Sequence, residues 1–404
     1  MESLNLILGF GSTGASVVRY FSKLDQPFIV MDSRKEPPGL KEIKGISKEK
    51  LHLGKFNPSV LQQVNRIIVS PGISFNNPVL VKARELKKEI NTDIDLYLKH
   101  AKTKIILVTG TNGKTTVVTM AEELLKRIYG KNLVLALGNI GKPVLDFAFN
   151  APKISIIETS SFHLQLSNAI FSHVGVLLNI GQDHLDRHSS MEDYVAVKKR
   201  VLSNTRVGLF GVNGLDLDLS VKDKIFNYHR IFEFWDNLLV NNLDKTWPFH
   251  EKENIKAAIS IYLALEHLYE NIEITNNSSI KRLIIRSINI LRSFERLPHR
   301  YEVLGSSRGI TFINDSKGTN LLSLEVALKS SKKLYGKERV LLLCGGDLKN
   351  QDLSRIPLGC LDSLKHIFSF GKDRKKITEA LQDKVECTIV KDLGQALDNA
   401  KSLS

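Results

Sequence analysis

Short apolar runs that each end in a glycine-rich or polar turn recur along this chain of 404 residues. In the first quarter they cover residues 4–10, 27–31 and 66–69, and an amphipathic stretch follows the first of them. Strands that alternate with helical segments are typical of βαβ units. The pattern therefore predicts an α/β fold with mainly parallel sheets.

The same pattern continues through two further regions. A strand at 104–108 leads through a polar turn into a helix from about residue 116 to 126, with Met120, Leu124 and Leu125 on one side. A chain of this length suits two to four domains, and we place three, at 1–94, 95–293 and 294–404. Further strands are expected at 133–137, 154–157, 174–179, 310–313, 340–343 and 366–370.

The composition is that of an ordinary globular protein, with 42% hydrophobic and 25% charged residues. The formal net charge is +14, from 57 basic and 43 acidic side chains. Because the basic residues are spread out rather than gathered in blocks, a nucleic-acid partner is not expected. Phosphorylated small substrates suit the charge equally well, so composition alone does not choose a ligand.

The three cysteines, Cys344, Cys360 and Cys387, form neither a C-x-x-C pair nor a metal-ligand spacing. Sparse cysteines of this kind suit a reducing compartment. The first residues do not resemble a signal peptide, and no uncharged apolar run is long enough to span a membrane. We therefore expect a cytoplasmic protein.

Residues 109–116, Thr-Gly-Thr-Asn-Gly-Lys-Thr-Thr, lie between a predicted strand and a predicted helix. Backbone N–H groups at such a helix start favour an anion, Lys114 adds a positive charge, and the Thr115 hydroxyl is suited to Mg²⁺. Position 108 is Val rather than the Gly of the full motif, so the segment is a variant phosphate-binding loop. A plain turn with a surface lysine is the alternative.

Residues 9–14, Gly-Phe-Gly-Ser-Thr-Gly, also follow a strand, and Asp32 ends the next strand 18 residues after Gly14. This is the spacing of a dinucleotide-binding fingerprint, in which the acid meets a ribose hydroxyl. The motif alone is weak, because a tight structural turn also explains it. It indicates a nucleotide diphosphate near a helix start and does not specify nicotinamide.

Polar groups follow several other strands, where open α/β sheets build their sites. Glu158 ends an apolar strand and is placed for Mg²⁺. Residues 183–188, with two carboxylates and two imidazoles, follow another strand, and a metal or substrate site and a surface turn are about equally favoured there. Residues 314–320 and 345–349 follow strands of the third region, and Cys344 before the latter is interpreted as a buried packing residue.

Together these ordered motifs resemble the Mur ligases, the ATP-dependent amide ligases of peptidoglycan precursor synthesis, over nearly the whole chain. The Asn-Asp-Ser-Lys-x-Thr-Asn form at 314–320 and Gly-Gly-Asp-x-Lys at 345–349 are most like the members that add D-glutamate. The resemblance implies a Rossmann-like N-terminal domain for the UDP end of the substrate, a central P-loop ATPase-like domain and a C-terminal Rossmann-like α/β domain for the amino acid. It is carried by residues 109–116, 138–141, 158–162, 179–187, 297–300 and 314–320.

The resemblance also implies roles for the matching positions. Lys198 would carry a carbamate; without the resemblance it is an ordinary helix lysine, and Lys199 is an equal candidate. Two Mg²⁺ ions would be held by Thr115, Glu158, His184 and Lys198, and Lys114, Glu158, His184 and Lys198 would serve catalysis. ATP would be bound by Gly110, Thr111, Asn112, Gly113, Lys114, Thr115, Thr116, Asn254, Arg300 and Asp315. The UDP-linked substrate would meet Gly11, Ser12, Thr13, Asp32, Ser33, Arg34, Ser70, Gly72, Asn139 and His184, and the amino acid would meet Lys317, Thr319 and Lys349.

The implied reaction, in a monomer, is ATP-dependent addition of D-glutamate to UDP-N-acetylmuramoyl-L-alanine. The substrate carboxylate would attack the γ-phosphate, and the amine of D-glutamate would then attack the resulting acyl phosphate. Two anions meet in the first step, so Mg²⁺ and lysines are needed to offset their repulsion. The alternatives are another amino-acid-adding member of the family, a weakly active nucleotide-binding relative and, with less support, an NAD-dependent oxidoreductase, which leaves residues 113–115 unexplained.

Three features depart from the family pattern. The usual His-Asn-x-x-Asn reads His250-Glu251-Lys252-Glu253-Asn254, so Glu251 replaces an asparagine that lies near the adenine. Residues 203–248 match poorly, which implies a trimmed central domain. The last strand of the family and its Ser-Pro-Ala turn, which grips the D-glutamate side chain, are not part of this sequence, which ends at Ser404.

Overall fold

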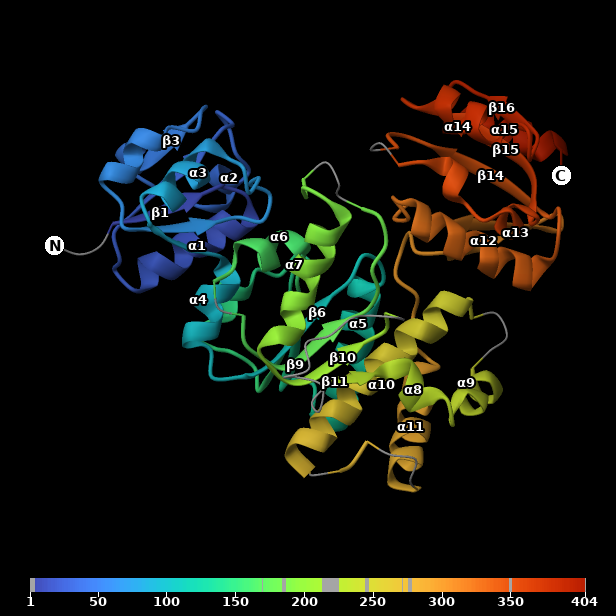
Figure 1. The fold of residues 1–404 in the computed structure, drawn as a ribbon, viewed down its shortest axis with the longest axis horizontal. Helices are drawn as coiled ribbons and strands as arrows, with labels where there is room; N and C mark the ends of the chain where they lie inside the picture. The colour runs from blue at the N-terminus through green and yellow to red at the C-terminus, as the bar shows by residue number, and fades with distance from the viewer. Residues whose placement is uncertain are drawn as a thin grey trace. The chain divides into compact units, whose positions relative to one another are not determined.

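The computed structural model describes residues 4–168, 170–183, 187–212, 225–243, 247–270, 272–274, 278–348 and 351–403. The chain forms two compact units, and Figure 1 labels their elements. Unit 1 comprises Met1–Asn179, Arg187–Phe234 and Ala257–Ser287, and unit 2 comprises Ile180–Asp186, Trp235–Lys256 and Ile288–Ser404.

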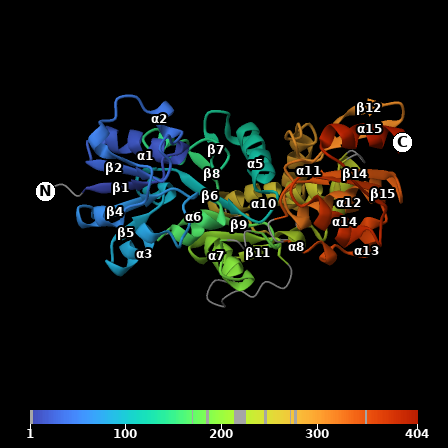
Figure 2. The ribbon, with the colours of Figure 1, turned by 90° about the horizontal axis from the view of Figure 1, so that it is seen from above.

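The N-terminal part of unit 1 is a parallel sheet with the order β3-β2-β1-β4-β5 in the described residues. Helices α1 and α3 lie on opposite sides of these strands (Figure 2), as expected when right-handed crossovers run in both directions from β1. The strands are β1 (Asn5–Leu8), β2 (Phe28–Asp32), β3 (Leu51–Leu53), β4 (Arg66–Val69) and β5 (Glu89–Asn91). The helices are α1 (Ser12–Lys23), α2 (Gly39–Glu42), α3 (Pro78–Glu85) and α4 (Asp93–His100).

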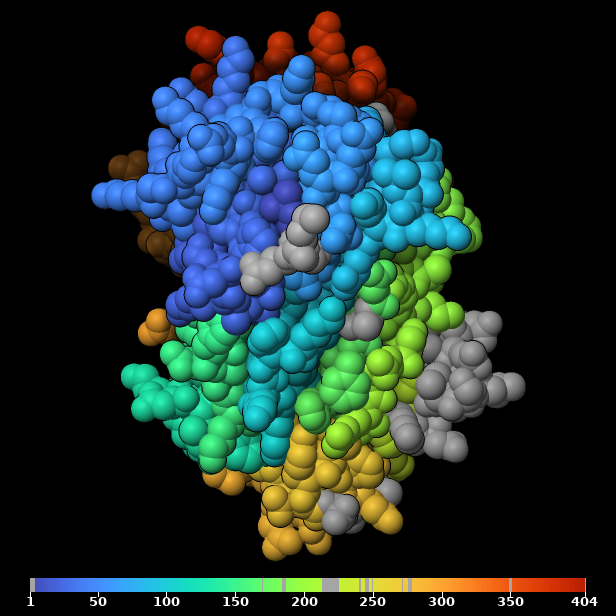
Figure 3. Space-filling view, turned by 90° about the vertical axis from the view of Figure 1, so that its left-hand side faces the viewer, coloured from blue at the N-terminus to red at the C-terminus, as the bar shows by residue number. Residues whose placement is uncertain are grey.

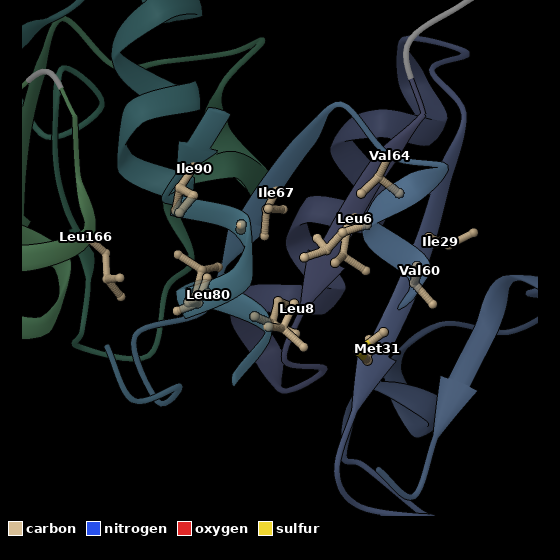
Figure 4. Packing of buried hydrophobic residues seen from close by; sticks show 14 residues of the cluster. Leu6, Leu8, Ile29, Met31, Val60, Val64, Ile67, Leu80, Ile90 and Leu166 are labelled. Atoms are coloured by element: carbon tan, nitrogen blue, oxygen red, sulfur yellow. The ribbon is translucent and has the colours of Figure 1, made fainter. Parts of the chain in front are cut away.

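Alternate residues of β1 point to opposite faces of this sheet, as the period of a strand requires. Leu6 and Leu8 therefore share one core with Val79 and Leu80 of α3 (Figure 4). Leu166 of α6 (Ser161–Leu166) joins the same core, although it follows a strand of the next sheet. Burial of a leucine side chain stabilises a fold by about 1.5–3 kcal/mol, so this shared core fixes the N-terminal sheet to the elements that follow it.

The central part of unit 1 is a second parallel sheet, with the order β11-β10-β9-β6-β8-β7 among the residues that the structure describes. Helices α5 and α7 lie on opposite faces of it (Figure 2). Its strands are β6 (Lys104–Thr109), β7 (Val134–Gly138), β8 (Ile154–Glu158), β9 (Ser172–Leu177), β10 (Thr205–Phe210) and β11 (Ile225–Asn227). The helices that follow α6 are α7 (Met191–Ser203), α8 (Tyr228–Phe232), α10 (Phe249–Glu270) and α11 (Ser278–Leu291), and unit 2 includes α10 up to Lys256 and α11 from Ile288.

In the space-filling view, the blue surface of the N-terminal residues is continuous with the cyan and green surface of the residues that follow (Figure 3). An ion pair joins the two parts of unit 1: the Arg19 guanidinium donates two hydrogen bonds of 2.8 Å to the Asp146 carboxylate. The hydroxyl of Tyr97 on α4 lies 2.7 Å from Ser155 Oγ on β8. Polar contacts and a shared apolar core therefore hold the two sheets of unit 1 together.

Helix α5 (Lys114–Tyr129) confirms the predicted central helix and is longer at both ends. Met120, Leu124 and Leu125 are fully buried, as the apolar face predicted. The helix begins at Lys114 because Gly113 adopts a left-handed conformation (φ 80°), which glycine takes without strain. It ends before Gly130, which has a φ of 121°.

Unit 2 contains an antiparallel pair, β12 (Glu302–Ser307) with β13 (Ile310–Asn314), and a parallel sheet with the order β14-β15-β16 in its described residues. The expected strands at 310–313, 340–343 and 366–370 are confirmed. The strands of the parallel sheet are β14 (Val340–Gly345), β15 (Leu364–Phe370) and β16 (Cys387–Ile389). The helices are α9 (Asp236–Asn242), α12 (Leu321–Tyr335), α13 (Leu358–Leu361), α14 (Arg374–Leu381) and α15 (Leu393–Leu403).

Among the described helices, none has both the length and the apolar character needed to cross a membrane.

Candidate active site

The predicted phosphate-binding loop joins β6 to α5 and is held in shape by Asn179. The N–H of Thr111 donates to the Asn179 carbonyl oxygen at 3.0 Å, and the N–H of Asn112 donates to Asn179 Oδ1 at 2.9 Å. Asn179 Nδ2 donates in return to the Asn112 carbonyl oxygen at 3.0 Å. The loop therefore has a fixed backbone at the start of a 16-residue helix, where the helix dipole favours an anion.

Two lysine side chains meet at one carbonyl oxygen of this loop. Lys114 Nζ donates to the carbonyl oxygens of Gly110 and Thr111, each at 2.8 Å. Lys198 Nζ, on α7, donates to the same Gly110 oxygen at 2.8 Å and is only 2% exposed. The fold thus brings together two of the residues predicted to serve catalysis, Lys114 from the start of α5 and Lys198 from the middle of α7.

Glu158 lies at the end of β8, where it pairs in register with Val108 just before the loop. Its carboxylate is 2% exposed, and Oε1 accepts a hydrogen bond from Asn139 Nδ2 at 3.2 Å. Among the described residues, Oε2 is buried and has no hydrogen-bond partner. A buried carboxylate oxygen of this kind is available to a ligand, and carboxylate and hydroxyl oxygens are the donors that Mg²⁺ prefers.

The residues predicted to hold Mg²⁺ therefore supply part of the set of oxygen ligands that this ion requires. Glu158 offers an unpaired oxygen, and Thr115 begins the helix after the loop. An ammonium group cannot ligate a cation, so Lys198 would contribute only after conversion to a carbamate, whose oxygens are negatively charged. His184 lies outside the described residues.

The sequence named His188 only as part of the 183–188 cluster and assigned no role to Tyr194, which the structure places against the loop. His188 is 4% exposed, and its Nε2 lies 2.9 Å from Ser161 Oγ. Its ring stacks on Phe162 with centroids 5.6 Å apart and meets the edge of Tyr194 at 5.1 Å. The Tyr194 hydroxyl lies 3.1 Å from Thr111 Oγ1. The spacing of Tyr194 and Lys198, four residues apart on one helix face, was the available signal.

In the N-terminal sheet, the carboxylate of Asp32 is already engaged by the protein. Oδ1 accepts from the backbone N–H and Nε of Arg34 at 2.9 Å, and Oδ2 accepts from the Phe10 N–H and Arg34 Nη2 at 2.7 Å. Burial raises the pKa of Asp32, but the hydrogen bonds from Arg34 and Phe10 outweigh burial and lower it below its usual value. Asp32 thus fixes the glycine-rich turn and Arg34, whose side chain is 53% exposed.

The glycines of this turn have different requirements. A Cβ on Gly14 would lie 2.1 Å from the Gly9 carbonyl oxygen, so only glycine fits there. A Cβ on Gly11 would meet nothing within 4 Å, which leaves open space beside Ser12 and Thr13 at the start of α1. This open helix start is where an anionic group could approach the backbone.

The remaining residues predicted for the UDP-linked substrate lie at strand ends of unit 1. Ser70 Oγ donates to the Gly9 carbonyl oxygen at 3.0 Å, and the Gly72 carbonyl oxygen accepts from Arg187 Nη2 at 3.2 Å. Asn139 contacts Glu158, and Ser33 is exposed next to Asp32. Arg187 also lies over the Phe162 ring, with its guanidinium carbon 4.7 Å from the ring centroid.

In unit 2, the residue that departs from the family motif is buried in an ion pair. Glu251 is 3% exposed, and its Oε2 lies 3.2 Å from Arg296 Nε. Burial raises the pKa of Glu251 to about 7, although Arg296 opposes the rise. Burial, together with the charges of Arg296 and Arg300, lowers the pKa of the neighbouring His250 to about 4.

Asp315, predicted near ATP, lies in the same unit. Its Oδ1 accepts from the Tyr301 N–H at 2.9 Å, and burial raises its pKa. The Lys317 N–H donates to the His299 carbonyl oxygen at 3.1 Å, and the Thr319 side chain is exposed. Asn254 lies on the first turns of α10, half-buried, and Lys349 lies outside the described residues.

A hydrogen bond in unit 2 joins two of the motifs. Asn320 Nδ2 donates to Asp183 Oδ2 at 3.1 Å, and both side chains are buried. Asn320 also caps α12, because its Oδ1 accepts from the Ser323 N–H at 2.9 Å. The segment that follows β9 is therefore attached to the start of α12.

A glycine-rich loop between a parallel strand and a long helix, beside a Rossmann-like sheet with a second glycine-rich helix start, is typical of nucleotide-using α/β enzymes. Family descriptions match three stretches of the chain: "Mur ligase MurD-like, N-terminal domain" at 3–92, "Mur ligase middle domain" at 108–234 and "Mur ligase, glutamate ligase domain" at 299–404. The chain belongs to the Mur ligase family, whose members are ATP-dependent amide-forming ligases.

Relatives match over almost the whole chain. A UDP-N-acetylmuramoylalanine–D-glutamate ligase of Coxiella burnetii (strain RSA 331 / Henzerling II) is 30% identical over 397 residues, which cover 96% of this chain and 88% of the relative. The enzymes of the same name from Buchnera aphidicola subsp. Schizaphis graminum and Legionella pneumophila (strain Paris) are 34% and 31% identical. These matches cover 94% and 99% of this chain and 86% and 91% of the relatives.

Solved structures share the fold at low sequence identity. A pseudomurein peptide ligase type C from Methanothermus fervidus has a TM-score of 0.55 at 15% identity and covers 100% of this chain and 95% of its own. UDP-N-acetylmuramate-alanine ligase MurC from Thermotoga maritima has a TM-score of 0.52 at 14% identity, with 97% and 91% covered. The expected fold, α/β with three domains and mainly parallel sheets, is confirmed.

Proposed function

We propose that this protein is an ATP-dependent ligase that adds D-glutamate to UDP-N-acetylmuramoyl-L-alanine through an acyl phosphate. The relatives that match nearly the whole chain carry that activity in their names, and the last third matches a glutamate ligase domain. The observation that carries the proposal is the convergence of Lys114 and Lys198 on the Gly110 carbonyl, one strand away from the unpaired oxygen of Glu158.

The first chemical requirement is to bring a carboxylate against a triphosphate. In the proposed site, the loop N–H groups and the start of α5 hold the phosphates, and the Lys114 ammonium reduces their negative charge. Lys114 now donates to two loop carbonyls, so phosphate would take over donors that are already positioned there. The cost of orienting the side chain is then small.

Glu158, Thr115 and, as a carbamate, Lys198 would hold Mg²⁺ in the proposed site, with His184 at a second ion. Mg²⁺ bound there would neutralise charge on the phosphate oxygens as the carboxylate attacks. Asn139 orients the Glu158 carboxylate next to the loop by donating a hydrogen bond to Oε1. The carbonyl of Gly110 holds the Lys198 side chain toward the same place.

The substrates would enter from the ends of different strands. The open helix start at Gly11, with Arg34, is proposed for the UDP end, and Ser70, Gly72 and Asn139 for the muramoyl-peptide part. Asn254, Arg300 and Asp315 are proposed for ATP, and Lys317, Thr319 and Lys349 for the carboxylates of D-glutamate. The domain boundaries at 94 and 293, a monomeric state and a cytoplasmic location also stay part of this proposal.

Product analysis tests the proposed function. The purified protein is incubated with ATP, Mg²⁺, UDP-N-acetylmuramoyl-L-alanine and D-glutamate, and the nucleotide product is measured by mass spectrometry. We expect a product heavier than the substrate by one glutamyl residue, formed with D-glutamate and not with L-glutamate or L-alanine. A product heavier by the residue mass of another amino acid, formed when that amino acid replaces D-glutamate, would instead support a different amino-acid-adding member of the family.

A further inference from the structure

The side of α7 that faces the phosphate-binding loop carries two buried residues, Tyr194 and Lys198. They are four positions apart and therefore lie on the same face of the helix. Tyr194 is 1% exposed and Lys198 is 2% exposed. A tyrosine hydroxyl and a lysine ammonium are costly to bury unless each is hydrogen-bonded, so their contacts are informative.

The two residues contact consecutive positions of the loop. The Tyr194 hydroxyl lies 3.1 Å from Thr111 Oγ1, and Lys198 Nζ donates to the carbonyl oxygen of Gly110 at 2.8 Å. Lys198 Nζ also lies 4.7 Å from the centre of the Tyr194 ring, which stabilises the ammonium by a cation–π interaction. Tyr194 thus touches both the loop and the lysine that the proposed function places at the metal ions.

Tyr194 also packs against the ring of His188. The His188 ring meets it at 5.1 Å with an interplanar angle of 62°, and His188 is fixed by Ser161 Oγ at 2.9 Å. Phe162 stacks on the His188 ring, with the centroids 5.6 Å apart. Because Ser161 and Phe162 begin α6, just after Glu158 and β8, this series of contacts joins the strand end that carries Glu158 to the loop.

We propose that Tyr194 is a positioning residue that sets the conformation of the phosphate-binding loop through the hydroxyl of Thr111. The inference rests on the proposed ATP-dependent reaction. Without the bond, the Thr111 side chain loses one of the contacts that orient it, and the N–H groups of the loop are less well ordered before ATP binds. The loss of one neutral hydrogen bond corresponds to about a fivefold weaker affinity.

The test measures ATP affinity by calorimetry in the full-length protein, with four variants. Tyr194→Phe keeps the ring under Lys198 and removes only the hydroxyl, and Thr111→Val removes the partner. We expect about a fivefold higher Kd for ATP in each variant, and about fivefold rather than twenty-five-fold in the double variant, because both remove the same bond. Thr111→Ser, which keeps the hydroxyl, should restore most of the affinity.

Tyr97→Phe is the matched control. Tyr97 is also a fully buried tyrosine, and its hydroxyl lies 2.7 Å from another side-chain hydroxyl, that of Ser155, in the same unit. It should lower the melting temperature about as much as Tyr194→Phe and leave the Kd for ATP unchanged. In steady state, Tyr194→Phe should raise the KM for ATP and leave the KM for D-glutamate unchanged.

Three outcomes would overturn the inference: an unchanged Kd for ATP in Tyr194→Phe, independent effects in the double variant, or an equal loss of affinity in Tyr97→Phe. The last would mean that any lost buried hydroxyl loosens the site. If the unsubstituted protein itself failed to bind ATP, the proposed function would fail instead, so the two failures are distinguishable.

Discussion

Lys198 Nζ donates a hydrogen bond to the carbonyl oxygen of Gly110 at 2.8 Å, although the two residues are 88 positions apart in the sequence. The bond connects α7 to the turn between β6 and α5. It places a buried lysine at the phosphate-binding loop, within the unit that also contains Glu158.

Replacing Lys198 with alanine should abolish most of the ligase activity. We expect a loss of at least about 100-fold, because a buried group that supports charge neutralisation is removed from the loop. Steady-state phosphate release measures the loss. Short carboxylic acids should restore part of the rate if the lysine functions as a carbamate, since they supply a similar anion in the vacated space.

Lys199 is the control for this change. It is the next residue on α7, it is only half-buried, and the sequence alone made it an equal candidate. Lys199→Ala should therefore keep a rate within about twofold of the unsubstituted protein. Equal losses in both variants would show that the effect comes from destabilised packing of α7 and not from Lys198.

Glu158→Gln should change the requirement for Mg²⁺. Glutamine keeps the size of the side chain and the contact with Asn139 but removes the negative charge. We expect the Mg²⁺ concentration for half-maximal activity to rise by about tenfold or more, as for a lost carboxylate ligand. Glu123→Gln, on α5 in an exposed pair with Arg127, should leave the Mg²⁺ dependence unchanged.

The two glycines of the N-terminal turn should respond differently to alanine. Gly14→Ala forces a Cβ to within 2.1 Å of a backbone oxygen and should lower the free energy of unfolding by about 3 kcal/mol. Gly11→Ala meets open space, so its stability should stay close to normal while the KM for the UDP-linked substrate rises. Chemical denaturation and substrate kinetics distinguish the two, and a normal KM in Gly11→Ala would argue against a substrate at this helix start.

The buried pair His250 and Glu251 should shape the dependence of stability on pH. The pKa of Glu251 is raised to about 7, so the folded state binds its proton more tightly and stability falls as pH rises from about 4.5 to 7. The pKa of His250 is lowered to about 4, so stability rises as pH increases from about 4 to 6.5. Arg296, Arg300 and Asp315 face the pair, and the two effects nearly cancel in the unsubstituted protein.

Glu251→Gln removes the contribution of Glu251 to the pH dependence of stability and leaves that of His250. Between pH 5 and pH 7, the free energy of unfolding of the variant should rise relative to that of the unsubstituted protein by up to about 3 kcal/mol, since one pKa unit corresponds to about 1.4 kcal/mol. Urea denaturation at a series of pH values measures it. Glu325→Gln, in an exposed pair with Lys329, is the control and should leave the pH profile unchanged; parallel profiles for both variants would contradict the raised pKa.

The strands that end in glycine-rich or polar turns could be predicted from the sequence, because a fully buried strand is a short apolar run with a clear end. The short strands β3, β5, β11 and β16 have three residues each and give no such run. Helix α10 was not predicted because Ile259, Tyr262 and Leu265 are buried together with the residues between them. A helix that is buried on all sides shows little amphipathic period.

The candidate site residues that directly follow a strand could be predicted from the sequence. Glu158 and the loop belong together because β6 and β8 are neighbouring parallel strands. The role of Lys198 was predicted only from the resemblance to a family, because the sequence of the helix does not distinguish Lys198 from Lys199. The contacts of Tyr194 with Thr111, and of Glu251 with Arg296, depend on how distant segments pack, which local sequence does not encode.

Isotope transfer is the most direct test of the central claim, that ATP phosphorylates the carboxylate of the UDP-linked substrate. UDP-N-acetylmuramoyl-L-alanine labelled with ¹⁸O in its terminal carboxylate is incubated with the protein, ATP, Mg²⁺ and D-glutamate, and the released phosphate is examined by mass spectrometry. An acyl phosphate leaves one carboxylate oxygen on the phosphate, so we predict phosphate that carries one ¹⁸O atom. Amide formation with unlabelled phosphate would contradict the account.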